Sequence, residues 1–85
     1  MNRKQQKTLD AIFEMPTRSN INFSDIEKLL AALGAVKSEG EGSRLSFQLN
    51  GKSLFMHRPH PGKEARKYQV EAAREFLNRV GTDNE

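Results

Sequence analysis

Apolar and polar residues alternate along two short stretches in the middle of the chain, residues 44–49 and 52–57. A period of two is typical of a β-strand with one buried face. The stretches are separated by Asn50 and Gly51. Asn-Gly between two alternating runs is the strongest short-range signal for a β-hairpin with a type I′ turn. The pattern therefore predicts two antiparallel strands joined by a two-residue turn.

The predicted turn also fixes which residues of the two strands face each other. The pairs are Arg44 with His57, Leu45 with Met56, Ser46 with Phe55, Phe47 with Leu54, Gln48 with Ser53, and Leu49 with Lys52. Because successive side chains of a strand point to opposite faces, one face of this hairpin is apolar and the other is polar. On the polar face Phe55 is the single large aromatic residue.

Three other stretches place apolar side chains every three or four residues, which predicts amphipathic helices. They cover about residues 3–14, residues 25–33, and a last stretch from residue 64 or 66 to residue 80. Pro16 ends the first helix because proline cannot continue it. Residues 35–38 form a further short candidate strand before the hairpin.

The second helix has the clearest predicted boundaries. Ser24 is a good N-cap residue, and Glu27 lies three residues later in the capping-box position. Gly34 follows the last apolar position and suits a left-handed C-terminal cap. We therefore expect this helix to begin just after Ser24 and to end just before Gly34.

The predicted order is helix, helix, three strands, helix, an α+β arrangement with one face of the sheet open. With 85 residues and 35% hydrophobic content, the chain has room for one hydrophobic core and none for a second. We expect a single domain over residues 1–85, with a frayed tail at residues 81–85.

The charge balance favours an anionic partner such as nucleic acid. Lys and Arg number 14 against 11 Asp and Glu, which gives a net charge of +3 and a pI near 9.5. The chain has no cysteine, so disulfides, thiolate zinc sites and cysteine nucleophiles are excluded. No apolar run approaches the ~20 residues needed to span a bilayer. We expect a soluble, cytoplasmic protein without a membrane partner.

Three side chains on the polar face of the hairpin suggest a chemical site. Arg44 and His57 are predicted neighbours across the strands, and Phe55 lies on the same side. An imidazole can move a proton at neutral pH, a guanidinium can bind a phosphate, and an exposed ring can stack on a base. A metal-independent ribonuclease would use these groups. The alternative is that Arg44 and His57 are only solvated surface and that the first helix covers Phe55.

The stretch FMHRPHPGKE, residues 55–64, leads into the last helix. Several cationic and histidine side chains lie in this stretch and directly after it. These are Arg58, His60, Lys63, Arg66 and Lys67. Cations at a helix N-terminus oppose the helix dipole, and this local cost in stability indicates a function. A phosphate would be attracted both by the cations and by the free N–H groups. The alternative is a solvated charge run whose prolines and glycine only shape the connection.

No metal site and no cofactor site is predicted. Two histidines without cysteine and without a nearby pair of carboxylates make a poor metal site. The glycine-rich residues 40–43 lack the Lys-Ser/Thr ending of a phosphate-binding loop, and no glycine pattern matches a dinucleotide fingerprint.

Three segments, DIEKLLAALGA, EGEGSRLSFQLNG and FMHRPHPGKE, resemble the HicA toxin family of bacterial toxin–antitoxin modules. The resemblance covers residues 26–80, and the motif HPGKE at residues 60–64 is common to the family. It implies a fold like the double-stranded-RNA-binding domain (dsRBD), in which a three-stranded antiparallel sheet packs on two helices. Residues 23–80 would then form this core, and residues 1–22 would add an N-terminal helix and a linker.

The resemblance also implies a function. Members of the family are mRNA interferases that cleave messenger RNA until a HicB antitoxin blocks them. The family usually has Gly-Ser-His at the start of the second strand, with that histidine catalytic, whereas this chain has Gly42-Ser43-Arg44. Either His57 has taken over the role of the missing histidine, or this branch has kept the fold and lost the nuclease activity.

The leading hypothesis is therefore a HicA-like endoribonuclease that needs no cofactor. Its catalytic residues would be His57 as general base, Arg44 as phosphate stabiliser and His60 as a supporting group. The residues expected to bind RNA are Phe55, Arg58, Lys63, Arg66 and Lys67. An acidic HicB-like antitoxin is expected to cover the basic face. The alternative is a non-catalytic RNA-binding or protein-binding module on the same fold.

Overall fold

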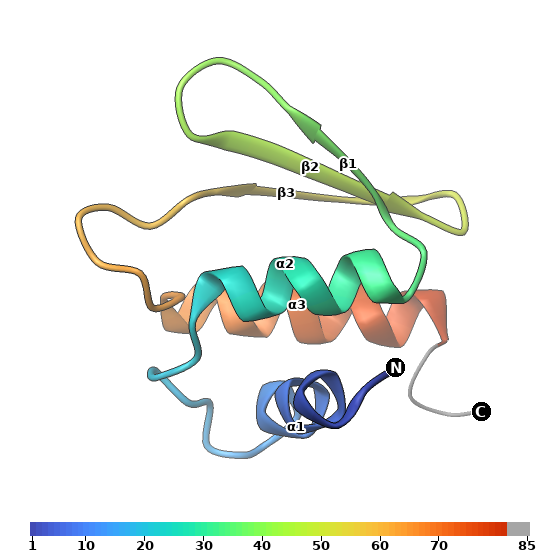
Figure 1. Cartoon of the computed structure of the whole chain (residues 1–85), viewed down its shortest axis with the longest axis vertical. Helices are drawn as coiled ribbons and strands as arrows, with labels where there is room; N and C mark the ends of the chain where they lie inside the picture. The colour runs from blue at the N-terminus through green and yellow to red at the C-terminus, as the bar shows by residue number, and fades with distance from the viewer. Residues whose placement is uncertain (82–85) are drawn as a thin grey trace.

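A computed structural model describes residues 1–81 of the chain. Within these residues the elements are α1 (Arg3–Ile12), α2 (Phe23–Ala32), β1 (Val36–Glu39), β2 (Arg44–Leu49), β3 (Lys52–His57) and α3 (Lys67–Val80) (Figure 1). The three strands form one antiparallel sheet in the order β1-β2-β3. The α+β fold class and the order of elements predicted from the sequence are confirmed.

The β2–β3 hairpin has the predicted turn and the predicted register. Asn50 and Gly51 both have positive φ angles, 52° and 77°, as a type I′ turn requires. All six residue pairs are those expected, with Arg44 opposite His57 at the open end of the hairpin. The Asn-Gly turn and the alternating pattern therefore set this part of the fold locally.

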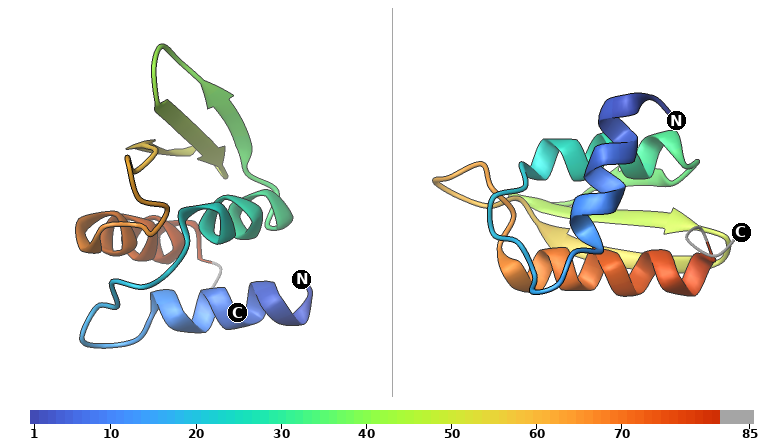
Figure 2. Two further views of the ribbon diagram at one scale, coloured as in Figure 1. Left: turned by 60° about the vertical axis from the view of Figure 1, so that its left-hand side comes forward. Right: turned by 90° about the horizontal axis from the view of Figure 1, so that it is seen from below.

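The sheet packs with its apolar face on α2 and α3, and α1 lies on the far side of these two helices (Figures 1 and 2). The buried sheet residues are Leu45, Phe47, Leu54 and Met56. They share one hydrophobic core with residues of the helices, among them Ile26, Leu29, Leu30, Val70, Ala73 and Leu77. Burial of each such side chain stabilises the fold by about 1.5–3 kcal/mol.

Helix α1 is held against α2 and α3 and does not reach the sheet. Ile12 is fully buried, and the guanidinium of Arg74 on α3 donates to the carbonyl of Ile12 at 2.9 Å and to the hydroxyl of Thr17 at 3.0 Å. These bonds satisfy groups at the C-terminal end of α1. The polar face of the sheet is left uncovered, and Phe55 is 69% exposed. The possibility that the first helix covers Phe55 is thereby excluded.

The predicted cap of α2 is wrong. The helix begins at Phe23, two residues earlier than expected, with Asn22 as N-cap and no side-chain cap bond. Phe23 is buried, and its N–H donates to the carbonyl of Lys63 at 2.9 Å. Glu27 pairs with Arg58 instead of closing a capping box. Tertiary contacts thus fix the start of this helix and override the local capping signal.

The other boundaries differ from the predictions by one to three residues. Helix α1 ends at Ile12, and β1 begins at Val36. Helix α3 begins at Lys67 and ends at Val80, and Gly81 after it has the left-handed conformation expected of a C-terminal cap. The predicted frayed tail beyond Gly81 lies outside the described residues.

Candidate functional site

Three residues on the open face of the sheet form a group that we call the sheet cluster: Arg44, Phe55 and His57. Arg44 and His57 are direct partners across the β2–β3 ladder, and Phe55 is on the same face two residues before His57. All three are exposed, and together with Met56 they line a shallow hollow. The predicted sheet residues are therefore brought together and are accessible to a ligand.

The loop between β1 and β2 folds back on Arg44. The N–H of Gly40 donates to the carbonyl of Arg44 at 2.9 Å. A Cβ atom at Gly40 would lie 3.4 Å from Cδ of Arg44, so the aliphatic part of the arginine packs over this glycine. A side chain at position 40 would compete with Arg44 for this space, and the glycine thereby helps to place the guanidinium.

Sequence reasoning missed the contact between Ser43 and His57. Its Oγ lies 3.5 Å from Nδ1 of the imidazole, and its carbonyl accepts from the N–H of Arg58 at 2.9 Å. This second bond extends the hairpin ladder by one pair beyond Arg44 and His57. Where the hydroxyl accepts from Nδ1–H, the other ring nitrogen is left with a free lone pair, as a general base requires.

Four further predicted residues form a second group, which we call the turn cluster: His60, Lys63, Arg66 and Lys67. They line a hollow beside the linker that precedes α2, and Ser19, Asn22 and the acidic Glu64 line it as well. None of the four makes an ion pair with any carboxylate in residues 1–81. The positive charge of this turn is available to an anion from outside.

The turn cluster is fixed to the linker by backbone hydrogen bonds. The N–H of Ala65 donates to the carbonyl of Ile21 at 2.7 Å, and the carbonyl of Lys63 accepts from Phe23. An isolated antiparallel β-bridge also pairs Asn22 with Glu64. The turn therefore has a defined position beside the start of α2, although it is built of polar residues and prolines.

Arg58 differs from the other predicted RNA-binding residues because it is held in ion pairs. Its guanidinium lies 3.4 Å from Oε2 of Glu27 on α2 and 3.3 Å from Oε2 of Glu39 on β1. The Glu27 oxygen is buried and has no hydrogen-bond partner among the described residues. The charge of Arg58 therefore balances a carboxylate that has lost most of its contact with water.

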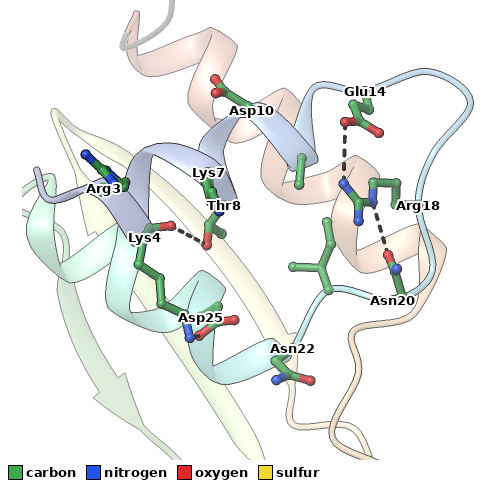
Figure 3. Close-up of a pocket in the computed structure, with 12 residues that line it drawn as sticks. Arg3, Lys4, Lys7, Thr8, Asp10, Glu14, Arg18, Asn20, Asn22 and Asp25 are labelled. Atoms are coloured by element: carbon green, nitrogen blue, oxygen red, sulfur yellow. Dashed lines mark hydrogen bonds and ion pairs between the residues drawn. The ribbon is translucent and has the colours of Figure 1, made fainter.

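Another hollow lies between α1, α2 and the linker, and its charges are mixed (Figure 3). Lys4 pairs with Asp25 at 3.7 Å, and Arg18 pairs with Glu14 at 3.4 Å. Three carboxylates line this hollow beside four cations, and two of the four cations are in these ion pairs. It contains none of the residues that the sequence predicted to be functional.

Two further observations concern the residues that the structure describes. No group of three or more His, Cys, Asp or Glu side chains in residues 1–81 could hold a metal ion. No helix in the same residues is long and apolar enough to cross a membrane.

The fold and the two clusters define a small α+β protein that presents a cationic, histidine-bearing surface at one end of an open sheet. The family model of the HicA toxin of bacterial toxin–antitoxin systems matches residues 23–79. The chain therefore belongs to the HicA toxin family, which places it in a toxin–antitoxin system with an antitoxin as partner. No curated protein and no solved structure matches the chain. Helix α1 lies outside the matched residues.

Proposed function

We propose that this chain is a ribonuclease toxin that cleaves messenger RNA without a metal ion and is blocked by a HicB-like antitoxin. Membership of the HicA family supports the toxin role. The observation that carries the nuclease proposal is the pair of Arg44 and His57, directly opposite each other on an uncovered sheet face beside an exposed Phe55. These side chains supply a proton acceptor, a phosphate-binding cation and a stacking surface within one small area.

The proposed reaction is a transesterification in which the RNA itself provides the nucleophile. The imidazole of His57 takes the proton of a ribose 2′-hydroxyl, whose oxygen then attacks the adjacent phosphorus. Arg44 donates hydrogen bonds to the phosphate oxygens, on which negative charge accumulates in the transition state. The bond from phosphorus to the 5′ oxygen breaks, this oxygen takes a proton from water, and a 2′,3′-cyclic phosphate remains, while His57 returns its proton to the solvent. Phe55 stacks on a neighbouring base and holds the strand in place.

The turn cluster binds the backbone of the same RNA. Its cations have no carboxylate partners within residues 1–81, so phosphates can neutralise them without breaking an ion pair. His60 belongs to this cluster and shares no hollow with His57. We therefore assign His60 to phosphate binding at the site and His57 to proton transfer.

The antitoxin is expected to be acidic where it meets the two clusters. An inhibitor that covers a cationic surface gains association rate and specificity from opposite charge. The sheet face and the turn are uncovered in the chain alone, so a partner can reach both at once. If the two proteins remain separate species on gel filtration at low salt, this part of the proposal is wrong.

A non-catalytic RNA-binding or protein-binding module is the second candidate, and Arg44 is the observation that favours it. The family usually has its catalytic histidine at this position, and arginine cannot act as a general base near neutral pH. In this case the clusters would bind RNA or the partner without cleavage. The likeness to the double-stranded-RNA-binding domain and the division at residue 23 remain predictions under either candidate.

The deciding experiment measures cleavage of a single-stranded RNA by the purified protein in excess EDTA. We expect wild type to cleave the RNA and to leave the matched DNA strand intact. His57→Ala should lower the cleavage rate by roughly 10²–10⁴-fold, the usual contribution of a general base. His60→Ala serves as the matched control and should weaken binding more than the rate at saturating RNA. Binding without cleavage by wild type would replace the nuclease with the binding module.

A further inference from the structure

Gln69 is a buried polar side chain that joins the two clusters. It lies in the first turn of α3 and is only 1% exposed. Its Nε2 donates to the carbonyl of His57 at 2.6 Å, and its Oε1 accepts from the N–H of Arg66 at 3.0 Å. One amide group thus binds the backbone at the last residue of β3 and at the residue before α3.

The two bonds determine how the amide must be oriented. The carbonyl of His57 can only accept a hydrogen bond, and the N–H of Arg66 can only donate one. The carbonyl of His57 points away from β2, at the free edge of the sheet, because the neighbouring pair at Arg58 and Ser43 carries the ladder bond. Neither group has another hydrogen-bond partner within residues 1–81, so the position requires a side chain that donates at one end and accepts at the other.

We infer that Gln69 is a positioning residue, which holds the sheet cluster and the turn cluster at one fixed separation by binding the backbone of His57 and of Arg66. This inference rests on the proposed function, because the separation matters only if one RNA strand contacts both clusters. A displacement of about 1 Å between reacting groups can lower a rate by roughly 10²-fold. Loss of the two bonds therefore affects cleavage without removing any group that touches the RNA.

The test compares Gln69→Met and Gln69→Glu with wild type across a range of pH. Gln69→Met keeps the volume and loses both bonds, so cleavage and RNA affinity should each fall, with cleavage at least roughly tenfold lower. Gln69→Glu should be as impaired above neutral pH, because a carboxylate has no proton to donate to the carbonyl of His57. Burial beside a carbonyl oxygen raises the pKa of the introduced carboxyl. As the pH falls, the neutral acid can donate to His57 and accept from Arg66.

The expected signature is a ratio of Gln69→Glu to wild-type activity that rises as the pH falls, while the ratio for Gln69→Met stays flat. Dividing by the wild-type value removes the contribution of every group that the proteins share, both histidines included. Phe76→Leu, a core change two turns along the same helix, is the control for lost stability. A role that is only structural would give equal losses in Gln69→Met and Phe76→Leu at equal stability, with no rescue by acid.

NMR separates failure of this inference from failure of the nuclease proposal. The Arg66 amide signal should move in Gln69→Met and should return toward its wild-type position in Gln69→Glu at low pH. If wild type does not cleave RNA, the nuclease proposal falls, and binding of single-stranded RNA by the same variants decides the role of Gln69. Wild-type binding by Gln69→Met, or an unmoved Arg66 amide, would overturn the inference.

Discussion

Two surfaces of this protein carry several cations each, and they differ in whether those cations have partners. In the hollow between α1 and α2, Lys4 pairs with Asp25 and Arg18 pairs with Glu14. In the turn cluster, none of His60, Lys63, Arg66 and Lys67 has a carboxylate partner within residues 1–81. Carboxylates of the chain therefore pair with two of the four cations of the first surface and with none of the second, which is the better placed to bind an anion from outside.

The difference shows why net charge is a poor guide to a binding surface. The excess of +3 is small and could be spread anywhere on the chain. The structure gathers cations without carboxylate partners in the turn that follows β3, the strand whose last residue, His57, belongs to the exposed sheet cluster. Helix α1, which lies outside the HicA match, packs on the opposite side of α2 and α3 and does not hide the sheet cluster.

The largest expected effect comes from removing three cations from each surface in turn. Lys63→Ala, Arg66→Ala and Lys67→Ala together reduce Lys and Arg from 14 to 11, equal to the 11 Asp and Glu. We expect RNA affinity at about 0.15 M salt to fall roughly fiftyfold, and the slope of log affinity against log salt to lose about 2, at ~0.7 per phosphate contact on a single strand. Titration of a labelled RNA at several salt concentrations measures both.

The matched control removes the same charge from α1. Arg3→Ala, Lys4→Ala and Lys7→Ala also bring the net charge from +3 to zero, but they lie beside the carboxylates of the other hollow. Their combined effect on RNA affinity should be less than about threefold. Equal losses in the two triple variants would mean that RNA responds only to net charge, and the distinction between the surfaces would be lost.

The second-largest expected effect concerns the bonds from α3 to the end of α1 and the linker, which stabilise the fold. Arg74→Ala removes bonds from the guanidinium to the carbonyls of Ile12 and Glu14 and to the hydroxyl of Thr17. We expect the free energy of unfolding to fall by about 2 kcal/mol, because charged donors would leave partly buried acceptors unpaired. Arg79→Ala removes the same charge from an exposed pair with Glu75 and should cost less than about 0.5 kcal/mol.

Denaturant unfolding measures the free energy of unfolding of both variants. RNA titration shows whether loss of the bonds between α3 and the end of α1 also changes RNA affinity. Because both changes remove one positive charge, any shared loss of RNA affinity reflects net charge alone. A larger loss of affinity in Arg74→Ala than in Arg79→Ala would show that α1 influences the binding surface through α3. The separation of the two surfaces would then be incomplete.

The sequence predicted the hairpin and its cross-strand pairs because these depend on neighbouring residues. Asn50 and Gly51 adopt positive φ angles readily, and the alternating pattern allows one register only. The meeting of Arg44 and His57 follows directly from that register. Local patterns also placed the three helices to within a few residues at most boundaries.

The sequence could not show contacts that join residues far apart in the chain. The start of α2 depends on a bond from Phe23 to Lys63, and the end of α1 depends on Arg74, 62 residues after Ile12. Gln69 looks like an ordinary polar position of an amphipathic helix until the carbonyl of His57 is seen beside it. No periodicity or motif in a single sequence reveals such pairs.

The smallest expected effect is at Arg58. The sequence predicts that this cation binds RNA, but in the structure it is held in ion pairs with carboxylates. Its ion pairs with Glu27 and Glu39 place it with the neutralised cations rather than with the turn cluster. Arg58→Met would leave the buried oxygen of Glu27 without a counter-charge. We expect the free energy of unfolding to fall by about 1–2 kcal/mol, less than for a fully buried pair because the Arg58 side chain is 41% exposed.

A double variant shows whether the loss arises from the stranded carboxylate. Glu27→Gln together with Arg58→Met removes both charges, so most of the lost stability should return, as denaturant unfolding of the single and double variants would measure. RNA affinity in Arg58→Met should fall no further than in Arg79→Ala, which carries the same charge change. If Arg58→Met instead keeps full stability and loses RNA affinity, then Arg58 releases its carboxylates to bind phosphate, and a cation's partners in the free chain do not decide what it binds.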